Sequence, residues 1–176
     1  EANARLQVEH TVTEEVTGID IVQTQIQIAE GASISDLDIR NTSNQPPVGF
    51  AIQTRVNMET LTSAGNVRPS SGELEVYDPP IGTGVRIDGC GYTTYTTNTS
   101  FDSLLAKLIV HSDSDQFSRV IKKSLRALSE FRIEGVLTNI SFLRNVLLHE
   151  DFYNGRIHTT WVDENMANLA DSSNNS

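Results

Sequence analysis

The first nine residues carry a row of side chains suited to chemistry on an anion held by a metal. Even positions are apolar, whereas the odd positions are polar or charged: Glu1, Asn3, Arg5, Gln7 and Glu9. Alternate residues of a strand point to opposite faces, so this pattern predicts one strand with all five side chains on one face. A straight strand of this length would span roughly 30 Å. We therefore expect a bend after Arg5 that brings Glu9 back toward one centre.

The residue types indicate what each could do. Glu1 and Asn3 offer the oxygen ligands that Mg²⁺ prefers. Arg5 offers a planar fork for a carboxylate, carbonate or phosphate, Gln7 can orient a small polar ligand, and Glu9 can accept a proton. The alternative is an ordinary half-solvated strand, which the alternation alone would favour. The choice between the two depends on the identity of the residues that follow.

Residues 5–10 spell Arg-Leu-Gln-Val-Glu-His, and Thr-Val-Thr-Glu-Glu-Val-Thr-Gly follows. This run resembles the signature of the biotin carboxylases, which belong to the ATP-grasp superfamily. Other ATP-grasp ligases share Glu-x-Asn-x-Arg but lack the Gln-Val-Glu-His continuation. Further along, Gly-x-Ala-x-x-x-Arg ending at Arg55, with Glu59 after it, is similar to the strand that carries a second catalytic arginine in this family. Asp102 lies in a stretch that is similar to the family's aromatic-Asp-Ser motif.

The resemblance implies specific roles at the amino end. Glu1 and Asn3 would lie at the Mg²⁺–ATP centre, where Mn²⁺ is the alternative metal. Bicarbonate would be held by Arg5, Gln7 and the backbone of Val8. Glu9 would be the base that deprotonates bicarbonate.

Three later residues also receive roles from the resemblance. Arg55 would stabilise the negative oxygen that biotin develops when its ring nitrogen loses a proton. Arg86, in a Pro-x-Gly-x-Gly-Val-Arg stretch, would lie at the edge used for dimer formation. Asp102 is expected to pair with Arg55 or with Arg86, and the sequence leaves that choice open.

The order of the predicted elements indicates an α+β fold, with an antiparallel sheet and flanking helices. We expect helices at 11–18, 19–30, 113–131 and 139–148, a last helical turn at 159–165, and strands at 49–56, 73–77, 85–88 and 104–110. Helix 19–30 has an apolar stripe typical of a helix pressed between layers. Asp113 with Gln116, and Thr138, are the expected caps of the two later helices. The expected division is 1–18 as the end of an ATP-grasp region, 19–165 as the C-terminal biotin carboxylase domain, and 166–176 as a linker.

Composition limits the partners and the compartment. The chain has 176 residues, 38% of them hydrophobic and 20% charged, as expected for a globular protein that can bury a core. A formal net charge of −10 argues against a nucleic acid or an anionic membrane as partner. Cys90 is the only cysteine, so no intrachain disulfide can form, which is compatible with the cytoplasm or the mitochondrial matrix.

The function predicted from the resemblance is carboxylation of carrier-bound biotin by bicarbonate, with ATP and Mg²⁺. The chain corresponds to the C-terminal portion of a biotin carboxylase, as found in pyruvate carboxylase and multidomain acyl-CoA carboxylases, and we expect it to be inactive alone. The partners would be the N-terminal and lid parts of the same enzyme, a biotin carboxyl carrier domain, a carboxyltransferase and a second subunit in a homodimer. The alternatives are a non-catalytic dimerisation or carrier-docking module and another ATP-grasp ligase.

Overall fold

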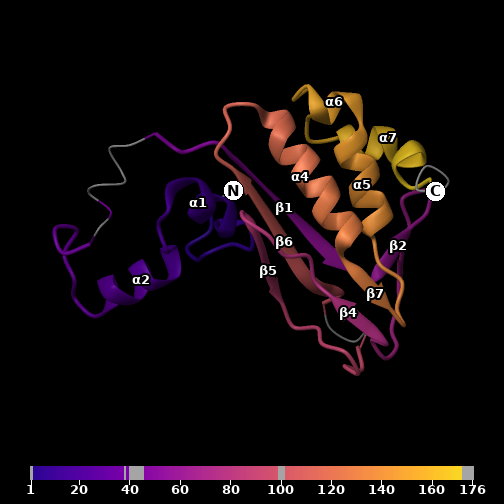
Figure 1. The fold of residues 1–176 in the computed structure, drawn as a ribbon, viewed down its shortest axis with the longest axis horizontal. Coiled ribbons are helices and arrows are strands. Elements are labelled where there is room, and N and C mark those ends of the chain that lie inside the picture. The colour runs from indigo at the N-terminus through magenta and orange to yellow at the C-terminus, as the bar shows by residue number, and fades with distance from the viewer. Residues whose placement is uncertain (1, 38, 40–45, 99–101, 172–176) are drawn as a thin grey trace.

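The computed structural model describes residues 2–37, 39, 46–98 and 102–171 (Figure 1). The helices in this part of the chain are α1 (His10–Thr17), α2 (Ile21–Ala29), α4 (Phe117–Glu130), α5 (Ile140–Leu148), α6 (Glu150–Tyr153) and α7 (Trp161–Leu169). The strands are β1 (Phe50–Asn57), β2 (Glu59–Leu61), β3 (Val67–Pro69), β4 (Val76–Asp78), β5 (Val85–Gly89), β6 (Leu104–Ser112) and β7 (Arg132–Glu134). The predicted mixture of antiparallel sheets and helices is confirmed.

The main sheet has three antiparallel strands in the order β1-β6-β5. In its register Arg55 lies opposite Lys107, which in turn lies opposite Asp88. The next row on the same face, two residues away, is Gln53, Ile109 and Arg86. Because side chains alternate along a strand, the intervening residues point to the opposite face. The sheet therefore has one face with several charged side chains and one apolar face.

The apolar face forms the core with α4. Val56, Leu108 and Val110 of the sheet are fully buried against a stripe on α4 that includes Val120 and Leu128. The stripe repeats at the spacing of a helix face, which is why the sequence predicted this helix correctly. Leu147 of α5 joins the same cluster. Figure 1 shows α4 and α5 side by side over one face of the sheet, while α1 lies at its other side.

Several elements are shorter or different from the prediction. Helix α4 begins after Gln116, and the side chain of Asp113 makes no cap contact there, while α5 begins after Asn139 and not after Thr138. The short pairs β2–β3 and β4–β7 were not all predicted, because strands of three residues carry too little alternation to be recognised. The last helical turn, predicted to end at residue 165, is longer than expected: α7 continues to Leu169, which is buried, and Asn145 donates hydrogen bonds to the carbonyls of Leu169 and Asp171.

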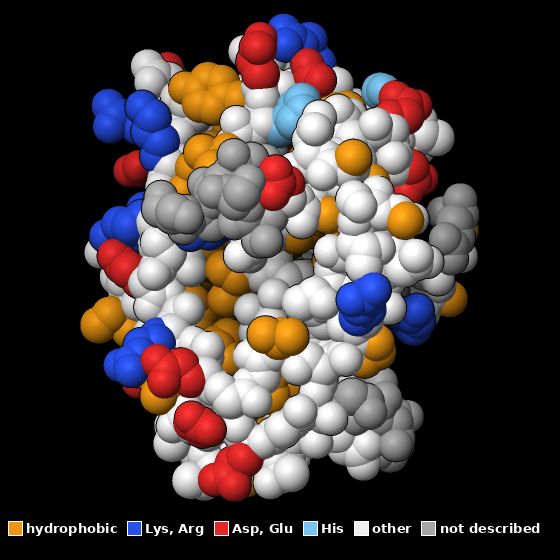
Figure 2. Space-filling model, turned by 90° about the vertical axis from the view of Figure 1, so that its right-hand side faces the viewer, with side chains coloured by type: hydrophobic (Ala, Val, Ile, Leu, Met, Phe, Trp, Pro, Cys, Tyr) orange, Lys and Arg blue, Asp and Glu red, His pale blue; other side chains and the backbone are white. Residues whose placement is uncertain are grey.

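The outer surface is mixed in charge. On the face shown in Figure 2, Lys and Arg side chains are interspersed with Asp and Glu, and hydrophobic side chains lie between them. In the described part of the chain, no helix is both long enough and apolar enough to cross a membrane.

Candidate functional site

The charged face of the sheet brings together residues from three strands. Lys107 Nζ lies 3.2 Å from Asp88 Oδ2, so the middle and outer strands are joined by an ion pair. Arg55 lies on the edge strand beside Lys107 and is half exposed. Neighbouring cations repel each other unless anions lie between or beside them. Asp88 and Asp102 supply that negative charge on either side of the two cations.

Helix α1 packs across the second row of this face. The hydroxyl of Thr11, a buried residue in its first turn, donates a hydrogen bond to Oε1 of Gln53. Glu14, one turn later, reaches Arg86 on β5, where the carboxylate oxygen lies 2.9 Å from Nη1. The helix therefore spans the sheet from β1 to β5. Because Gln53 and Arg55 are two residues apart on one face of β1, the start of α1 lies close to Arg55.

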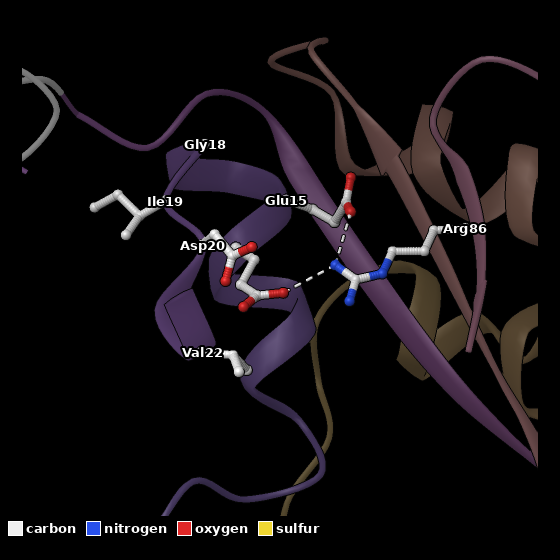
Figure 3. Close-up of a pocket in the computed structure, with 7 residues that line it drawn as sticks. Glu15, Gly18, Ile19, Asp20, Val22 and Arg86 are labelled. Carbon is white, nitrogen blue, oxygen red and sulfur yellow. Dashed lines mark hydrogen bonds and ion pairs between the residues drawn. The ribbon is translucent and has the colours of Figure 1, made fainter. Parts of the chain in front are cut away.

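Arg86 is the centre of an ion-pair cluster (Figure 3). Its guanidinium contacts Glu14, Glu15 at 3.5 Å and Asp88 at 2.8 Å. The hydrogen bond that Arg86 donates to Asp88 raises the pKa of the guanidinium, against the opposing effect of burial. Burial would by itself raise the pKa of Asp88, but the hydrogen bonds from Arg86 and Lys107 and their positive charges outweigh it and lower the pKa. Both shifts favour the charged forms, so Arg86 and Asp88 stabilise each other as an ion pair.

The same cluster closes one side of an open cavity of about 530 Å³. The cavity lies between the end of α1, the start of α2 and β5, and its lining includes Gly18, Asp20, Val22 and Arg86. Glu14 also accepts a hydrogen bond from the backbone N–H of Ile21 at 3.0 Å. One carboxylate therefore ties α1 to both the sheet and the first turn of α2.

The predicted strand through the first nine residues is wrong. Residues 2–9 form no strand; the backbone bends at Ala4 and Arg5 and turns at Val8 and Glu9. A strand needs hydrogen-bonded neighbours, and none of the described strands pairs with this segment. The predicted change of direction near Arg5 is present, however, and the carbonyl of Gln7 accepts a hydrogen bond from the backbone N–H of His10, which starts α1.

The motif side chains are exposed or half-buried in the described structure. Asn3, Arg5 and Glu9 are exposed, and Gln7 and Val8 are half-buried; Glu1 lies outside the described residues. Among the residues that the structure describes, the Arg5 side chain donates a hydrogen bond only to the neighbouring carbonyl of Leu6. Glu9 directly precedes α1, and its side chain does not cap the helix.

The structure resolves which arginine pairs with Asp102. Its Oδ2 lies 3.7 Å from Nη2 of Arg55, and its Oδ1 accepts the backbone N–H of Leu104 at 3.0 Å. Arg55 is thus held from one side by an exposed carboxylate. Arg86, the other candidate, is instead saturated by carboxylates of its own chain.

Some contributors were missed by sequence reasoning. The sequence could have identified Gln53, because a residue two positions from Arg55 lies on the same face of the strand. Glu14 and Lys107 carry no such signal, because their partners lie 72 and 19 positions away in the sequence. Among the described residues, no group of three or more His, Cys, Asp or Glu side chains is placed so that it could hold a metal ion.

Comparison with protein-family models gives two matches. Residues 53–164 match the biotin carboxylase C-terminal domain. Residues 1–37 match the ATP-binding domain of the carbamoyl-phosphate synthase L chain. The first match covers more than half of the chain and includes Arg55, Arg86 and Asp102. The second covers the motif, α1 and α2.

Relatives of known function and solved structures agree with these matches. Mitochondrial pyruvate carboxylase of Homo sapiens is 45% identical over 166 residues, which are 94% of this chain and 14% of the relative. Pyruvate carboxylase of Pichia angusta is 45% identical over 93% of the chain and 14% of its own length. The chain thus spans about one seventh of these relatives.

Among solved structures, a single-chain, multi-domain long-chain acyl-CoA carboxylase superposes with a TM-score of 0.88 at 42% identity, covering 96% of this chain and 18% of its own. The biotin carboxylase domain of a single-chain bacterial carboxylase superposes with a TM-score of 0.86 at 39% identity, and the match covers 98% of this chain and 38% of that chain. The third structure is the biotin carboxylase domain of 2-oxoglutarate carboxylase from Hydrogenobacter thermophilus, solved with MgADP and bicarbonate. It superposes with a TM-score of 0.83 at 33% identity, and the match covers 95% of this chain and 35% of that chain. The fold, the family match and the identity to these proteins agree: the chain belongs to the biotin carboxylase C-terminal domain family.

Proposed function

We propose that this chain is the part of a biotin carboxylase that supplies the catalytic base and the second arginine. The complete enzyme would use ATP, Mg²⁺ or Mn²⁺ and bicarbonate to carboxylate biotin on a carrier domain, and this chain alone would not turn over ATP. The observation that carries the proposal is the seating of α1 on β1. The Thr11–Gln53 hydrogen bond brings the start of α1, directly after Glu9, beside the strand that presents Arg55.

Bicarbonate would be held by Arg5, Gln7 and the backbone of Val8. The guanidinium of Arg5 is exposed, and its planar fork matches the oxygens of a planar anion. Glu9 would take the proton from the O–H of bicarbonate onto a carboxylate oxygen, which leaves a stronger nucleophile. A positioned base of this kind accelerates a reaction by roughly 10²–10⁴-fold.

Arg55 would stabilise negative charge on the biotin oxygen when the ring nitrogen is deprotonated. Its guanidinium is half exposed and therefore accessible to a substrate, while Asp102 at 3.7 Å restrains it from one side. A cation fixed in advance where charge develops can contribute several kcal/mol to the lowering of a barrier. Asp102 would act as a positioning residue, because it touches Arg55 and not the substrate.

The residues of this chain fit only part of a metal site. Asn3 offers an exposed amide oxygen and Glu1 would add a carboxylate, and the described residues contain no cluster of three His, Cys, Asp or Glu side chains. Mg²⁺ commonly binds one or two protein oxygens together with substrate phosphates, which fits so small a ligand set. When bound there, the metal would neutralise phosphate charge during phosphoryl transfer.

The proposed partners follow from the same assignment. They are the N-terminal and lid parts of the same enzyme, the carrier domain, a carboxyltransferase and a second subunit, with Arg86 and Asp102 as candidate interface residues. The predicted domain boundaries at residues 18 and 165 stay predictions. So does a cytoplasmic or mitochondrial location.

The test is Glu9→Gln and Arg55→Gln in the full-length carboxylase. We expect the rate of biotin carboxylation to fall by roughly 10²–10⁴-fold for Glu9→Gln. Glu73→Gln is the matched control, because Glu73 is exposed and belongs to neither α1 nor β1. If Glu9→Gln and Glu73→Gln both keep the wild-type rate, the chain is a non-catalytic docking or dimerisation module. Carbamoylation without bound biotin would instead identify another ATP-grasp ligase.

A further inference from the structure

The backbone that carries Arg55 is supported from the sheet on one side only. Among the described strands, β1 lies at the edge of the three-stranded sheet and pairs with β6 alone. That pairing becomes irregular within two residues of Arg55, because the register shifts between Val56 and Asn57. The direction of the strand at Arg55 therefore depends on contacts from outside the sheet.

Asn139 supplies these contacts along the outer edge of β1. Its Nδ2 donates a hydrogen bond to the carbonyl of Arg55 at 3.1 Å, and its Oδ1 accepts the backbone N–H of Asn57 at 2.9 Å. The backbone N–H of Asn139 also donates to the carbonyl of Asn57, at 3.1 Å. A side-chain amide presents a donor and an acceptor side by side, as a peptide group does. Asn139 therefore binds the edge of β1 as a neighbouring strand would.

This use of Asn139 replaces a local role that the residue could have had. Asn139 directly precedes α5, at the position where asparagine is favoured because its side chain can cap the helix. Here the side chain makes no cap hydrogen bond, and the residue is only 7% exposed, turned toward β1. Helix α5 is itself fixed in the core through Leu147. The start of α5 thus gives up its own cap and connects β1 to a fixed element.

The contact with Asp102 is too weak to fix the direction of Arg55 by itself. Its carboxylate lies 3.7 Å from the guanidinium, which is longer than a hydrogen bond, and the two side chains are 46% and 66% exposed. We infer that Asn139 is a positioning residue for Arg55. It holds the backbone of β1 so that the guanidinium points to where the biotin oxygen gains negative charge. The inference deepens the proposed function and rests on the role proposed there for Arg55.

The test is Asn139→Ala in the full-length carboxylase, with steady-state kinetics of biotin carboxylation. A displacement of about 1 Å at a site can lower a rate by about 10²-fold, so we expect kcat to fall by roughly 10–100-fold. The KM for ATP should stay at the wild-type value, because Asn139 touches none of the residues proposed to hold bicarbonate or the metal.

Asn145→Ala is the matched control. Asn145 belongs to α5 itself and is 8% exposed, and its Nδ2 donates to the carbonyls of Leu169 and Asp171, not to β1. Each variant removes side-chain hydrogen bonds to two backbone groups, so both should lower the melting temperature by a similar amount. Only Asn139→Ala should lower kcat.

Two further variants separate positioning from a general loss of structure. Asn139→Ala in an Arg55→Gln background should lower kcat no further than Arg55→Gln alone, because no guanidinium is left to position. Asn139→Asp keeps the size of the side chain and the acceptor for the N–H of Asn57, so it serves if the alanine variant does not fold. Its carboxylate cannot donate to the carbonyl of Arg55, and kcat should again fall.

Three results would overturn the inference while the proposed role of Arg55 stands. They are a wild-type kcat for Asn139→Ala or Asn139→Asp, an equal loss of kcat in Asn139→Ala and Asn145→Ala, and a full additional loss in the Arg55→Gln background. A wild-type rate for Arg55→Gln itself would instead refute the role of Arg55, and the inference with it. The two failures are therefore distinguishable.

Discussion

Removing the charge of Glu14 should uncouple α1 from the sheet by a measurable amount. Its side chain is only 9% exposed and accepts one hydrogen bond from Arg86 and one from Ile21. A glutamine side chain would keep one acceptor, so Glu14→Gln removes a single charge-assisted bond, of the kind that contributes about 1.5–3 kcal/mol. Arg86 is 36% exposed and keeps Asp88 and Glu15 as partners. We therefore expect Glu14→Gln to lower the free energy of unfolding by about 1.5 kcal/mol, the low end of this range.

The assay is urea unfolding at pH 7 of the wild type, Glu14→Gln, Arg86→Gln and the double variant. The double-mutant cycle isolates the pairwise term, which should be about 1 kcal/mol. Glu15→Gln is the matched control, because Glu15 also faces Arg86, but at 3.5 Å and with 24% exposure. Its coupling to Arg86 should be below about 0.5 kcal/mol. Equal coupling of the two glutamates to Arg86 would refute the claim that Glu14 is the residue that ties α1 to β5.

Four further substitutions test the core, two glycines with positive φ and the ion-pair cluster. Leu108→Ala, at a fully buried position of β6, should cost about 2–5 kcal/mol in a thermal melt, and a smaller loss would mean that the core is not closely packed there. Gly135→Ala should cost at least about 2 kcal/mol, because an added Cβ would meet the carbonyl of Glu73. Gly155→Ala, also at positive φ but facing open space, should cost only about 1 kcal/mol. Asp88→Asn should be less stable than the wild type at neutral pH. The difference in the free energy of unfolding should shrink as the pH falls below about 4, because a carboxylate with a lowered pKa stabilises the fold only while it is ionised. A constant difference down to about pH 2, measured by urea unfolding, would contradict this reasoning.

Sequence periodicity predicted the elements that build the core. The stripe on α4 and the buried run of β6 carry their signals within 9 to 14 residues, so local reading was sufficient. The predicted strand at 49–56 is also present as β1, in which Thr54 and Val56 are buried and Arg55 is exposed. The three-residue strands and the continuation of α7 past residue 166 could not be predicted from local sequence patterns. Their stability comes from tertiary contacts, such as the hydrogen bond from Asn145 to Leu169.

The candidate site was also predicted only in part. The motif residues were recognised from their types, but their predicted strand is absent, because alternation alone does not provide a hydrogen-bonding neighbour. The pairing of Asp102 with Arg55 could not be chosen from sequence, since Arg86 was an equal candidate until Glu14, Glu15 and Asp88 were found around it. Long-range ion pairs depend on register and helix placement, which no local pattern encodes.

The alternation along β1 limits how this strand can change during evolution. Thr54 and Val56 face the interior on either side of Arg55. A shift of one position relative to β6 would push the guanidinium into the apolar interior and expose the valine, so a misaligned strand is penalised twice. Chains that fold in the wrong alignment are therefore eliminated by instability, whatever their function. Selection for a well-folded protein then also preserves the direction in which Arg55 points.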